Sequence, residues 1–439
     1  MTIKRGFLKV SLLAALVMLV SLVLAACGDN TATPVPATTA AATKAATTAA
    51  GATTAAGATT AAATTASGAT TAAATTAAGA TTAAAASTLT GDIPIGAVWS
   101  LTGGAAIYGP SQKNAADMAV DEINKSGMLG TAKIKLITED DRSVKEGGIP
   151  AFDKLINQDK VVAILGPTLS STALATNPVA QDKKVVVLGV SNTAGGIVEI
   201  GNYVFRDSLP EASVIPNTVK ATKEKLGYKN VAVMYGDDDA FTKSGYDVFK
   251  KALDDNGVKI LTTETFKKGD TDFSAQLTKI KSLNPDAIIV SALAEEAAGI
   301  MSQGRQLGIP TTVKFIGGNG FNSAQLAKLA GAAAEDAISG AAWFISNDAN
   351  GNQNFVKAYT AKYGTAPDQF AAQAYAGVYI LATAIKNTGA ANSTAIRDSL
   401  AKLKDIDTIL GKFSFDDTRN PVHTPILQIV KNGKFELFK

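Results

Sequence analysis

Cysteine and histidine are almost absent from this chain. Its 439 residues include one Cys and one His. One Cys cannot form a disulfide within the chain, so the folded part must be stabilised by its hydrophobic core alone. One Cys and one His also supply too few ligands for a zinc or copper site. These absences argue against a disulfide framework and against a metal centre.

The motifs of nucleotide-dependent enzymes are missing as well. Neither Gly-x-x-x-x-Gly-Lys-Ser/Thr nor a clear Gly-x-Gly-x-x-Gly occurs, so we expect no ATPase, no dinucleotide enzyme and no bound cofactor. The segment 189–193, Gly-Val-Ser-Asn-Thr, comes within one residue of a hydrolase nucleophile elbow, and His423 lies late in the chain as a triad requires. However, Thr193 stands where the tight turn needs Gly, and His423 lies between two prolines in a segment typical of a turn. We therefore expect no catalytic residues.

Charges are nearly balanced along the chain. Lys and Arg number 41 against 38 Asp and Glu, which gives a formal net charge of +3, and the basic residues are scattered. A nucleic-acid-binding surface concentrates its basic residues, so we expect no nucleic-acid partner. The acidic segments 237–239 and 348–352 are expected to be solvated turns rather than calcium sites.

Residues 1–26 have the pattern of an export signal. Lys4, Arg5 and Lys9 precede an apolar run that ends in Leu-Ala-Ala-Cys at Cys27. This ending resembles a bacterial lipobox, which implies cleavage before Cys27 and a diacylglycerol on its thiol. The other interpretation is an ordinary signal, or an N-terminal membrane helix, that happens to contain a Cys. We expect an exported protein held by lipid on the outer face of the cytoplasmic membrane.

The segment that follows, residues 27–90, has the composition of a linker. After Cys27 it is almost wholly Ala, Thr and Gly. It lacks the large apolar side chains whose burial offsets the chain entropy lost on ordering. We expect a disordered tether with a mean span of about 40 Å if it behaves as a coil. Its many Thr residues leave glycosylation open.

From Ile93 onward, continuously apolar segments alternate with helical ones. Such segments are typical of parallel strands buried between two helix layers. The alternation starts afresh after Pro210, and the length exceeds what one core encloses, so an α/β fold with two lobes is expected. Asn177-Pro178 is expected to bend or restart a helix. Helices at 353–363, 369–388 and 394–403 are expected to cover the first lobe, and tail strands at 413–415, 426–430 and 434–437 to close the second.

Hydroxyl side chains follow two successive buried segments. They are Ser170, Ser171 and Thr172 after the run 161–165, and Ser191 and Thr193 after the run 185–188. The carboxyl ends of parallel strands meet at one edge, where open α/β folds bind ligands. Hydroxyls and free N–H groups at a helix N-terminus there would receive a small anion such as a carboxylate. The alternative is that these residues are only helix caps and turn formers.

Several short motifs along residues 91–439 occur in a familiar order and spacing. They are Ile-Gly-Ala-Val at 95–98, Thr-Gly at 102–103, Tyr-Gly at 108–109, Asn-Ala-Ala at 114–116, Asp-Glu-Ile-Asn at 121–124, Asp-Asp at 140–141, Gly-Pro at 166–167, Ser-Asn-Thr at 191–193, Asp-Asp-Asp-Ala-Phe at 237–241, Asp-Thr-Asp-Phe at 270–273, Asp-Ala-Ile-Ile at 286–289 and Ala-Tyr-Ala at 374–376. Together they resemble the leucine/isoleucine/valine-binding family, which are type I periplasmic solute-binding proteins of ABC importers.

The resemblance implies two Rossmann-like lobes joined by a three-segment hinge, a Venus flytrap in which ligand is trapped as the lobes close. We expect the crossings near 210, 344 and 412. The first lobe would then contain residues 91–210 and 345–411, and the second residues 211–344 and 412–439. The implied partners are an ABC permease and its separate ATPase subunits.

The resemblance also implies a role for particular residues. The hydroxyls of Ser170 and Thr193, with the backbone N–H groups of Ser191 and Thr193, are expected to bind the ligand carboxylate. Tyr108 and Phe241 are expected to sandwich the ligand. The far side is expected to be lined by Leu293, Ala294 and Phe370.

Asn319 departs from the family pattern. In amino-acid-binding members a carboxylate at this position pairs with the ligand ammonium, which an amide cannot neutralise. Either Glu295, Glu296 or one of the acids at 237–239 substitutes, or the ligand has no ammonium; Asn319 is otherwise a turn residue. The expected ligand is a branched-chain or other aliphatic amino acid, with an amide, urea or aromatic acid as the alternative. A ligand-sensing receptor domain is the alternative function.

Overall fold

The computed structural model describes residues 89–439. The export signal, Cys27 and nearly all of the expected tether lie outside the described residues. Leu89 already packs into the hydrophobic core, so the folded part begins slightly before the boundary at 91 expected from the sequence. Among the residues described, no helix is both long and apolar enough to span a bilayer.

The first lobe is built on a five-stranded parallel sheet with the order β2-β1-β3-β4-β5. Its strands are β1 (Asp92–Trp99), β2 (Lys133–Asp140), β3 (Ala163–Leu165), β4 (Val186–Gly189) and β5 (Val204–Arg206). Side chains of β1 alternate between two cores: Ile95 and Ala97 face one, and Val98 faces the other. A sheet buried on both faces needs a helix layer on each.

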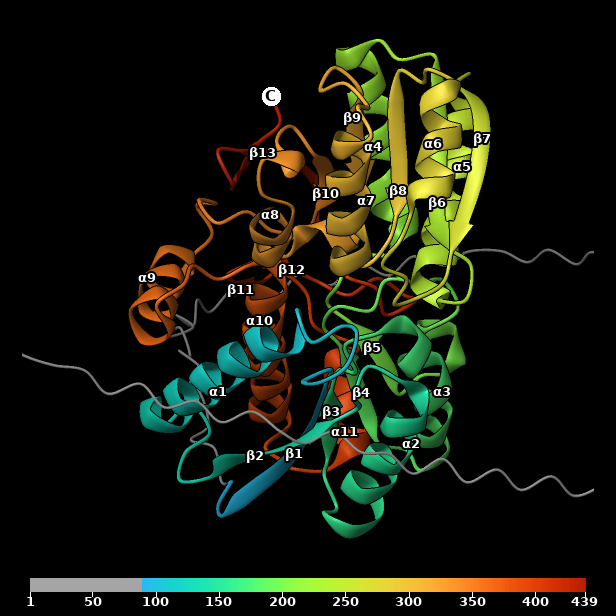
Figure 1. The fold of residues 1–439 in the computed structure, drawn as a ribbon. Helices are drawn as coiled ribbons and strands as arrows, with labels where there is room; N and C mark the ends of the chain where they lie inside the picture. Colours follow the sequence, from blue (N-terminus) through green and yellow to red (C-terminus); the bar gives the residue numbers. More distant parts are fainter. Residues whose placement is uncertain (1–88) are drawn as a thin grey trace, which may run out of the picture. The chain divides into compact units, whose positions relative to one another are not determined.

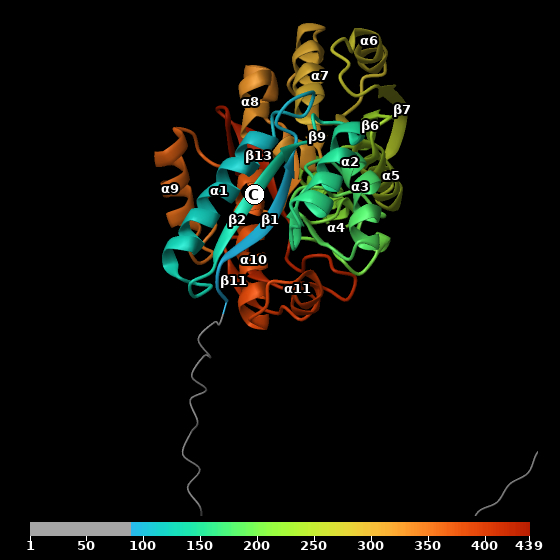
Figure 2. The same cartoon turned by 90° about the horizontal axis from the view of Figure 1, so that it is seen from below.

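Those two layers come from distant parts of the chain. One consists of α1 (Gly109–Ser126), α9 (Asn352–Tyr363), α10 (Gln369–Thr388) and α11 (Ser393–Leu400), and the other of α2 (Lys145–Asp153), the π-helical turn Lys154–Gln158 and α3 (Ser170–Asp182). Helices α1 and α10 lie side by side (Figure 2). Helix α3 continues through Pro178 as one helix, so of the bend or restart expected there the restart does not occur.

The second lobe is built on a seven-stranded sheet with the order β14-β13-β10-β9-β8-β6-β7 (Figure 1). Its strands are β6 (Asn230–Gly236), β7 (Lys259–Phe266), β8 (Ala287–Ser291), β9 (Lys314–Gly317), β10 (Ile338–Ala341), β13 (Ile426–Lys431) and β14 (Lys434–Leu437). Strands β6 to β10 are mutually parallel. The hairpin of β13 and β14 extends the sheet, with β13 antiparallel to β10. One face packs on α4 (Glu211–Leu226) and α5 (Ala240–Asp255), and the other on α6 (Ser274–Ser282), α7 (Ala294–Gln306) and α8 (Ala324–Ala330).

The chain crosses between the sheets three times, at 207–210, 342–351 and after Pro421. The third crossing is later than the boundary at 412 expected from the sequence. Strand β12 (Gly411–Phe413) pairs with β11 (Ile406–Thr408) and not with the second sheet. Phe413 and Phe415 pack edge to face with ring centroids 4.9 Å apart, in the core of the first lobe. Burying two Phe rings there holds this segment on the first lobe, at roughly 1.5–3 kcal/mol for each ring.

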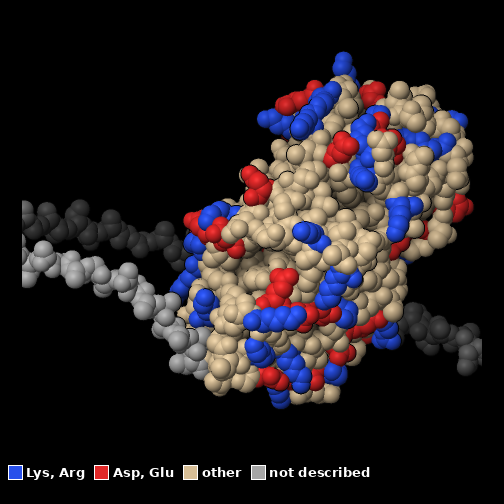
Figure 3. Space-filling view, turned by 90° about the vertical axis from the view of Figure 1, so that its left-hand side faces the viewer, with Lys and Arg blue, Asp and Glu red and all other residues tan. Residues whose placement is uncertain are grey.

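Charged side chains of both signs are mixed on the surface. On the face drawn in Figure 3, Lys and Arg are interspersed with Asp and Glu rather than gathered into one patch. This distribution agrees with the scattered basic residues of the sequence.

Candidate functional site

Five helices begin at one place between the lobes. Helices α1, α3 and α10 of the first lobe present Tyr108, Ser170 and Phe370, each at or beside its first residue. Helices α5 and α7 of the second lobe present Phe241 and Leu293 in the same way. The N-termini of α5 and α10 are capped by the Asp239 and Asp368 carboxyls, whereas those of α1 and α3 have no side-chain cap. The partial positive charge at the uncapped ends favours an anion without any cationic side chain.

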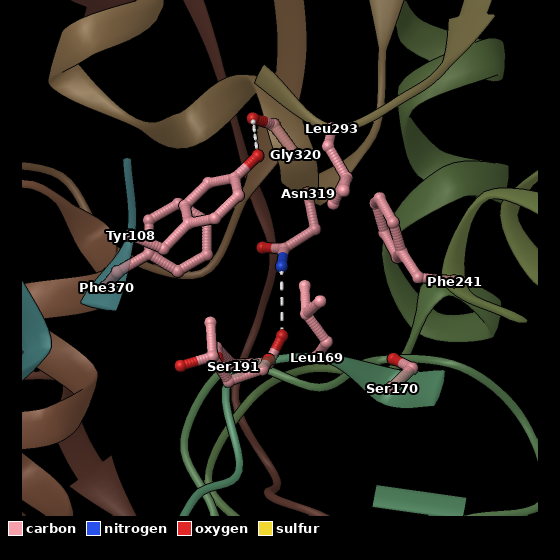
Figure 4. Close-up of a pocket in the computed structure, with 10 residues that line it drawn as sticks. Tyr108, Leu169, Ser170, Ser191, Phe241, Leu293, Asn319, Gly320 and Phe370 are labelled. Atoms are coloured by element: carbon pink, nitrogen blue, oxygen red, sulfur yellow. Dashed lines mark hydrogen bonds between the residues drawn. The ribbon is translucent and has the colours of Figure 1, made fainter. Parts of the chain in front are cut away.

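These five residues surround a small cavity of about 20 Å³. Figure 4 shows Tyr108 and Phe370 on one side and Phe241 on the other. The full lining is Tyr108, Thr168, Leu169, Ser170, Ser191, Phe241, Leu293, Asn319, Gly320 and Phe370. Of the residues expected from the sequence, all line this cavity except Thr193 and Ala294. Thr168, Leu169 and Gly320 also line the cavity; they lie within two residues of Ser170 or Asn319 but were not expected from the sequence.

The first-lobe side of the cavity depends on a tight turn after β3. Gly166 has φ +97°, and a Cβ there would lie 2.3 Å from the Val98 carbonyl oxygen. Only glycine fits this turn, and the chain then leads to the first residue of α3. Beyond it, Gln112 Nε2 donates to Ser191 Oγ at 2.9 Å, and Ser191 Oγ donates to the Thr168 carbonyl at 2.7 Å. The Ser191 hydroxyl therefore has no proton left to donate to a ligand.

Ser170 differs from Ser191 because its proton remains free. Its Oγ accepts from the backbone N–H groups of Thr193 at 3.2 Å and Ala194 at 3.3 Å. No acceptor for its own O–H lies among the described residues. Since two donors already occupy the oxygen, Ser170 can act toward a ligand only as a hydrogen-bond donor.

Thr193 lies behind the cavity in this structure. Its Oγ1 donates to Glu211 Oε1 at 2.9 Å, and Thr193 is not among the residues that line the cavity. Glu211 is the first residue of α4 in the second lobe and is almost fully buried. Burial raises the pKa of its carboxyl to about 7. The bond joins the two lobes beside the first crossing.

Tyr108 joins the lobes on the opposite side. Its hydroxyl donates to the Gly320 carbonyl at 3.1 Å and accepts from the Ala294 N–H at 2.6 Å. Ala294 thus contributes its N–H to Tyr108 rather than a wall of the cavity. Gly320 permits this approach, because a Cβ there would lie 2.2 Å from the Ala292 carbonyl oxygen. The structure is therefore a closed form, with side chains of each lobe bonded to the other.

No acidic side chain enters the cavity. Across residues 89–439, the side chains that line it are all uncharged. Glu296 accepts from the Gly269 N–H, and Asp239 accepts from Ser171 Oγ at 2.6 Å, so both are engaged elsewhere. Burial raises the pKa of Glu295 to about 7, which disfavours its charged form. None of the acids expected to replace a family carboxylate at Asn319 lines the cavity.

The side chain of Asn319 forms hydrogen bonds from the second lobe to the first at the cavity. Its Nδ2 donates to the Ser191 carbonyl at 3.2 Å (Figure 4), and its Oδ1 accepts from Gln369 Nε2 at 2.7 Å. The amide is held by residues of the first lobe although Asn319 directly follows β9 of the second.

The hydrolase arrangement considered from the sequence is not formed. His423 lines a separate depression with Asn347 and Leu410, away from the residues around Ser191. Its burial lowers the pKa to about 4. No cluster of three His, Cys, Asp or Glu side chains suited to a metal ion occurs in the described part of the chain.

Comparison with known proteins identifies the fold. Residues 92–434 match the family model described as periplasmic binding protein. The chain belongs to this family. As a periplasmic binding protein it has the two-lobed α/β architecture expected from the sequence, which confirms the fold class. Periplasmic binding proteins bind solutes and are not a family of enzymes.

Three relatives illustrate the similarity. The Leu/Ile/Val-binding protein BraC3 of Rhizobium johnstonii is 29% identical over 343 residues, covering 74% of this chain and 88% of its own. The branched-chain amino acid transporter substrate binding protein LivJ of Streptococcus pneumoniae, solved with isoleucine, is 32% identical with a TM-score of 0.74, covering 79% of this chain and 98% of its own. An ABC transporter solute binding protein of Rhodopseudomonas palustris, solved with 3,4-dihydroxy benzoic acid, is 26% identical with a TM-score of 0.72, covering 78% and 95%.

Proposed function

We propose that this periplasmic binding protein is the solute-binding component of an ABC importer and holds a small carboxylate between its lobes. The observation that carries the proposal is the convergence of five helix N-termini on an uncharged cavity, with the Ser170 O–H free to donate. Such a cavity stabilises a carboxylate through dipoles and charge-assisted hydrogen bonds. Ligand contacts with both lobes would favour the closed form, after which the ligand passes to a permease with separate ATPase subunits.

A branched-chain or other aliphatic amino acid is the ligand class that the relatives favour. The names of BraC3 and LivJ refer to leucine, isoleucine and valine or to branched-chain amino acids. In this chain Leu169, Leu293 and Phe241 give the cavity an apolar wall that suits an aliphatic side chain.

A carboxylate without an ammonium group is the second candidate. It is favoured by the absence of any acidic side chain among the cavity-lining residues described above, since a buried unpaired ammonium is costly. The Rhodopseudomonas palustris neighbour was solved with such an acid.

A thermal-shift screen tests the proposed function. Amino acids, 2-oxo acids, aromatic acids, amides and urea are each added to the purified protein, and the melting temperature is recorded. We expect a raised melting temperature with at least one small carboxylate, because a ligand that binds only the folded state stabilises it. The primary amide of the same compound is the control and should have little effect. Equal stabilisation by acid and amide would exclude the carboxylate site.

We also propose that Cys27 anchors the protein to the membrane. The residue lies outside the described part, and its lipobox is the support. Replacing Cys27 with Ser is expected to release the protein into the medium or soluble fraction, whereas Thr33→Ser should leave it in the membrane fraction. Immunoblots of the two fractions measure this. Membrane retention of the Cys27→Ser protein would show that something other than lipid holds it.

A further inference from the structure

A chain of hydrogen bonds runs from the second crossing to the ligand cavity. The Ala342 N–H donates to Gln369 Oε1 at 2.6 Å, and Gln369 Nε2 donates to Asn319 Oδ1 at 2.7 Å. Asn319 Nδ2 then donates to the Ser191 carbonyl at 3.2 Å. Gln369 is the first residue of α10 and is 2% exposed, so water does not compete for these bonds.

The donor-to-acceptor direction of these hydrogen bonds is fixed by the backbone groups at the two ends, the Ala342 N–H and the Ser191 carbonyl. A backbone N–H can only donate, so the atom of Gln369 that faces Ala342 must be the oxygen. The other end of the Gln369 amide is then a donor and requires the oxygen of Asn319. At the far end a backbone carbonyl can only accept, and it faces the nitrogen of Asn319. Both side-chain amides are therefore oriented by backbone groups, one of which can only donate and the other only accept.

Each backbone acceptor named at the cavity already accepts one hydrogen bond. The carbonyl of Ser191 accepts from Asn319, that of Gly320 from Tyr108, and that of Thr168 from the Ser191 hydroxyl. The groups left for a ligand are donors: the Ser170 O–H and the second N–H of Asn319 Nδ2. An ammonium group carries donors only, so it would have to share carbonyl oxygens that already accept a hydrogen bond, and it meets no acidic side chain there.

We propose that Gln369 positions Asn319 as a hydrogen-bond donor, and that the cavity thereby prefers a 2-oxo or 2-hydroxy acid over the corresponding amino acid. The carboxylate occupies the Ser170 side, and the carbonyl or hydroxyl oxygen on the adjacent carbon accepts from Asn319. This inference rests on the proposed function and narrows its ligand class. Gln369 touches no ligand and acts through Asn319 as a positioning residue.

Calorimetric titration with leucine and with 4-methyl-2-oxopentanoate tests the inference on the unaltered protein. The two share a carbon skeleton and a carboxylate, and differ only in the group that faces Asn319. We expect the oxo acid to bind more than about tenfold more tightly, because leucine leaves a buried donor unpaired. Equal or tighter binding of leucine overturns the inference while leaving the proposed function intact. If neither of these acids nor any other small carboxylate binds, the result contradicts the proposed function itself.

The Gln369→Glu protein tests the positioning role separately. A carboxylate at 369 can accept from Ala342 but cannot donate to Asn319, so the hydrogen bond that holds the Asn319 oxygen is lost. The Asn319 amide is then no longer held as a donor toward the ligand. We expect the preference between the two ligands to shift toward leucine by more than about tenfold.

Gln325→Glu is the matched control for this substitution. Gln325 lines the same depression as Gln369, but its side chain makes no hydrogen bond to Gln369 or Asn319 among the described residues. The control introduces the same charge and should keep the preference of the unaltered protein. An unchanged preference in Gln369→Glu, or an equal shift in the control, would contradict the positioning role. If Gln369→Glu does not fold, the titration of the unaltered protein still decides the ligand preference.

Discussion

Replacing Ser170 with Asp is expected to abolish ligand binding, with at least about a hundredfold loss of affinity. The substitution removes the free O–H donor and places a negative charge where the ligand carboxylate is proposed to lie. Aspartate is well tolerated in the first turn of a helix, so the fold should be retained. Calorimetry with the ligand found for the unaltered protein measures the loss, and circular dichroism checks the fold.

Ser274→Asp is the matched control for that prediction. Ser274 is also the first residue of a helix, α6, but it is exposed and outside the cavity. The same change of charge there should leave the affinity within about twofold of the unaltered protein. If both substitutions weaken binding equally, overall charge rather than the Ser170 position is responsible. If Ser170→Asp still binds the ligand tightly, the carboxylate does not lie at the start of α3.

The second large expected effect is a fall in stability as pH rises, caused by Glu211. Burial raises its pKa from 4.5 to about 7, so between these values the folded state holds a proton that the unfolded state has lost. The folded state binds more protons, and the free energy of unfolding therefore decreases with rising pH. The contribution is complete below about pH 4.5 and is lost as the pH passes 7, for a total of about 3 kcal/mol.

Glu211→Gln isolates this contribution from those of Glu295 and Glu296, whose pKa values burial also raises. Glutamine can still accept from Thr193 but does not titrate. Urea unfolding at pH 5 and pH 8 is expected to show a loss of stability smaller by about 2–3 kcal/mol in the variant than in the unaltered protein. Glu224→Gln, exposed on the same helix, should behave like the unaltered protein. Identical pH dependence in Glu211→Gln would show that Glu211 is charged in the folded state.

The position of the cavity was predictable from local sequence. Buried parallel strands leave their carboxyl ends at one edge, so the hydroxyls after 161–165 and 185–188 had to lie close together. The backbone N–H of Thr193 does donate to Ser170 Oγ, although the two residues are far apart in the chain. Tyr108, Phe241 and Phe370 came from the family resemblance, and the structure brings them to the same cavity.

The directions of polar side chains could not be predicted in the same way. The Thr193 hydroxyl turns to Glu211 because that buried carboxyl comes from the other lobe, which no spacing in the sequence reveals. The orientation of Asn319 depends on Gln369, fifty residues later in the chain. The third crossing is late because Phe413 and Phe415 pack in the core of the first lobe. Their apolar character alone does not tell which of the two lobes buries them. Long-range partners of this kind appear only in three dimensions.

A crystal structure of the protein with its tightest-binding small carboxylate tests the central claim most directly. We expect density for the ligand among Tyr108, Phe241 and Phe370, with a carboxylate oxygen within about 3 Å of Ser170 Oγ and facing the first N–H groups of α3. A ligand outside this cavity, or one whose carboxylate points away from Ser170, would contradict the account.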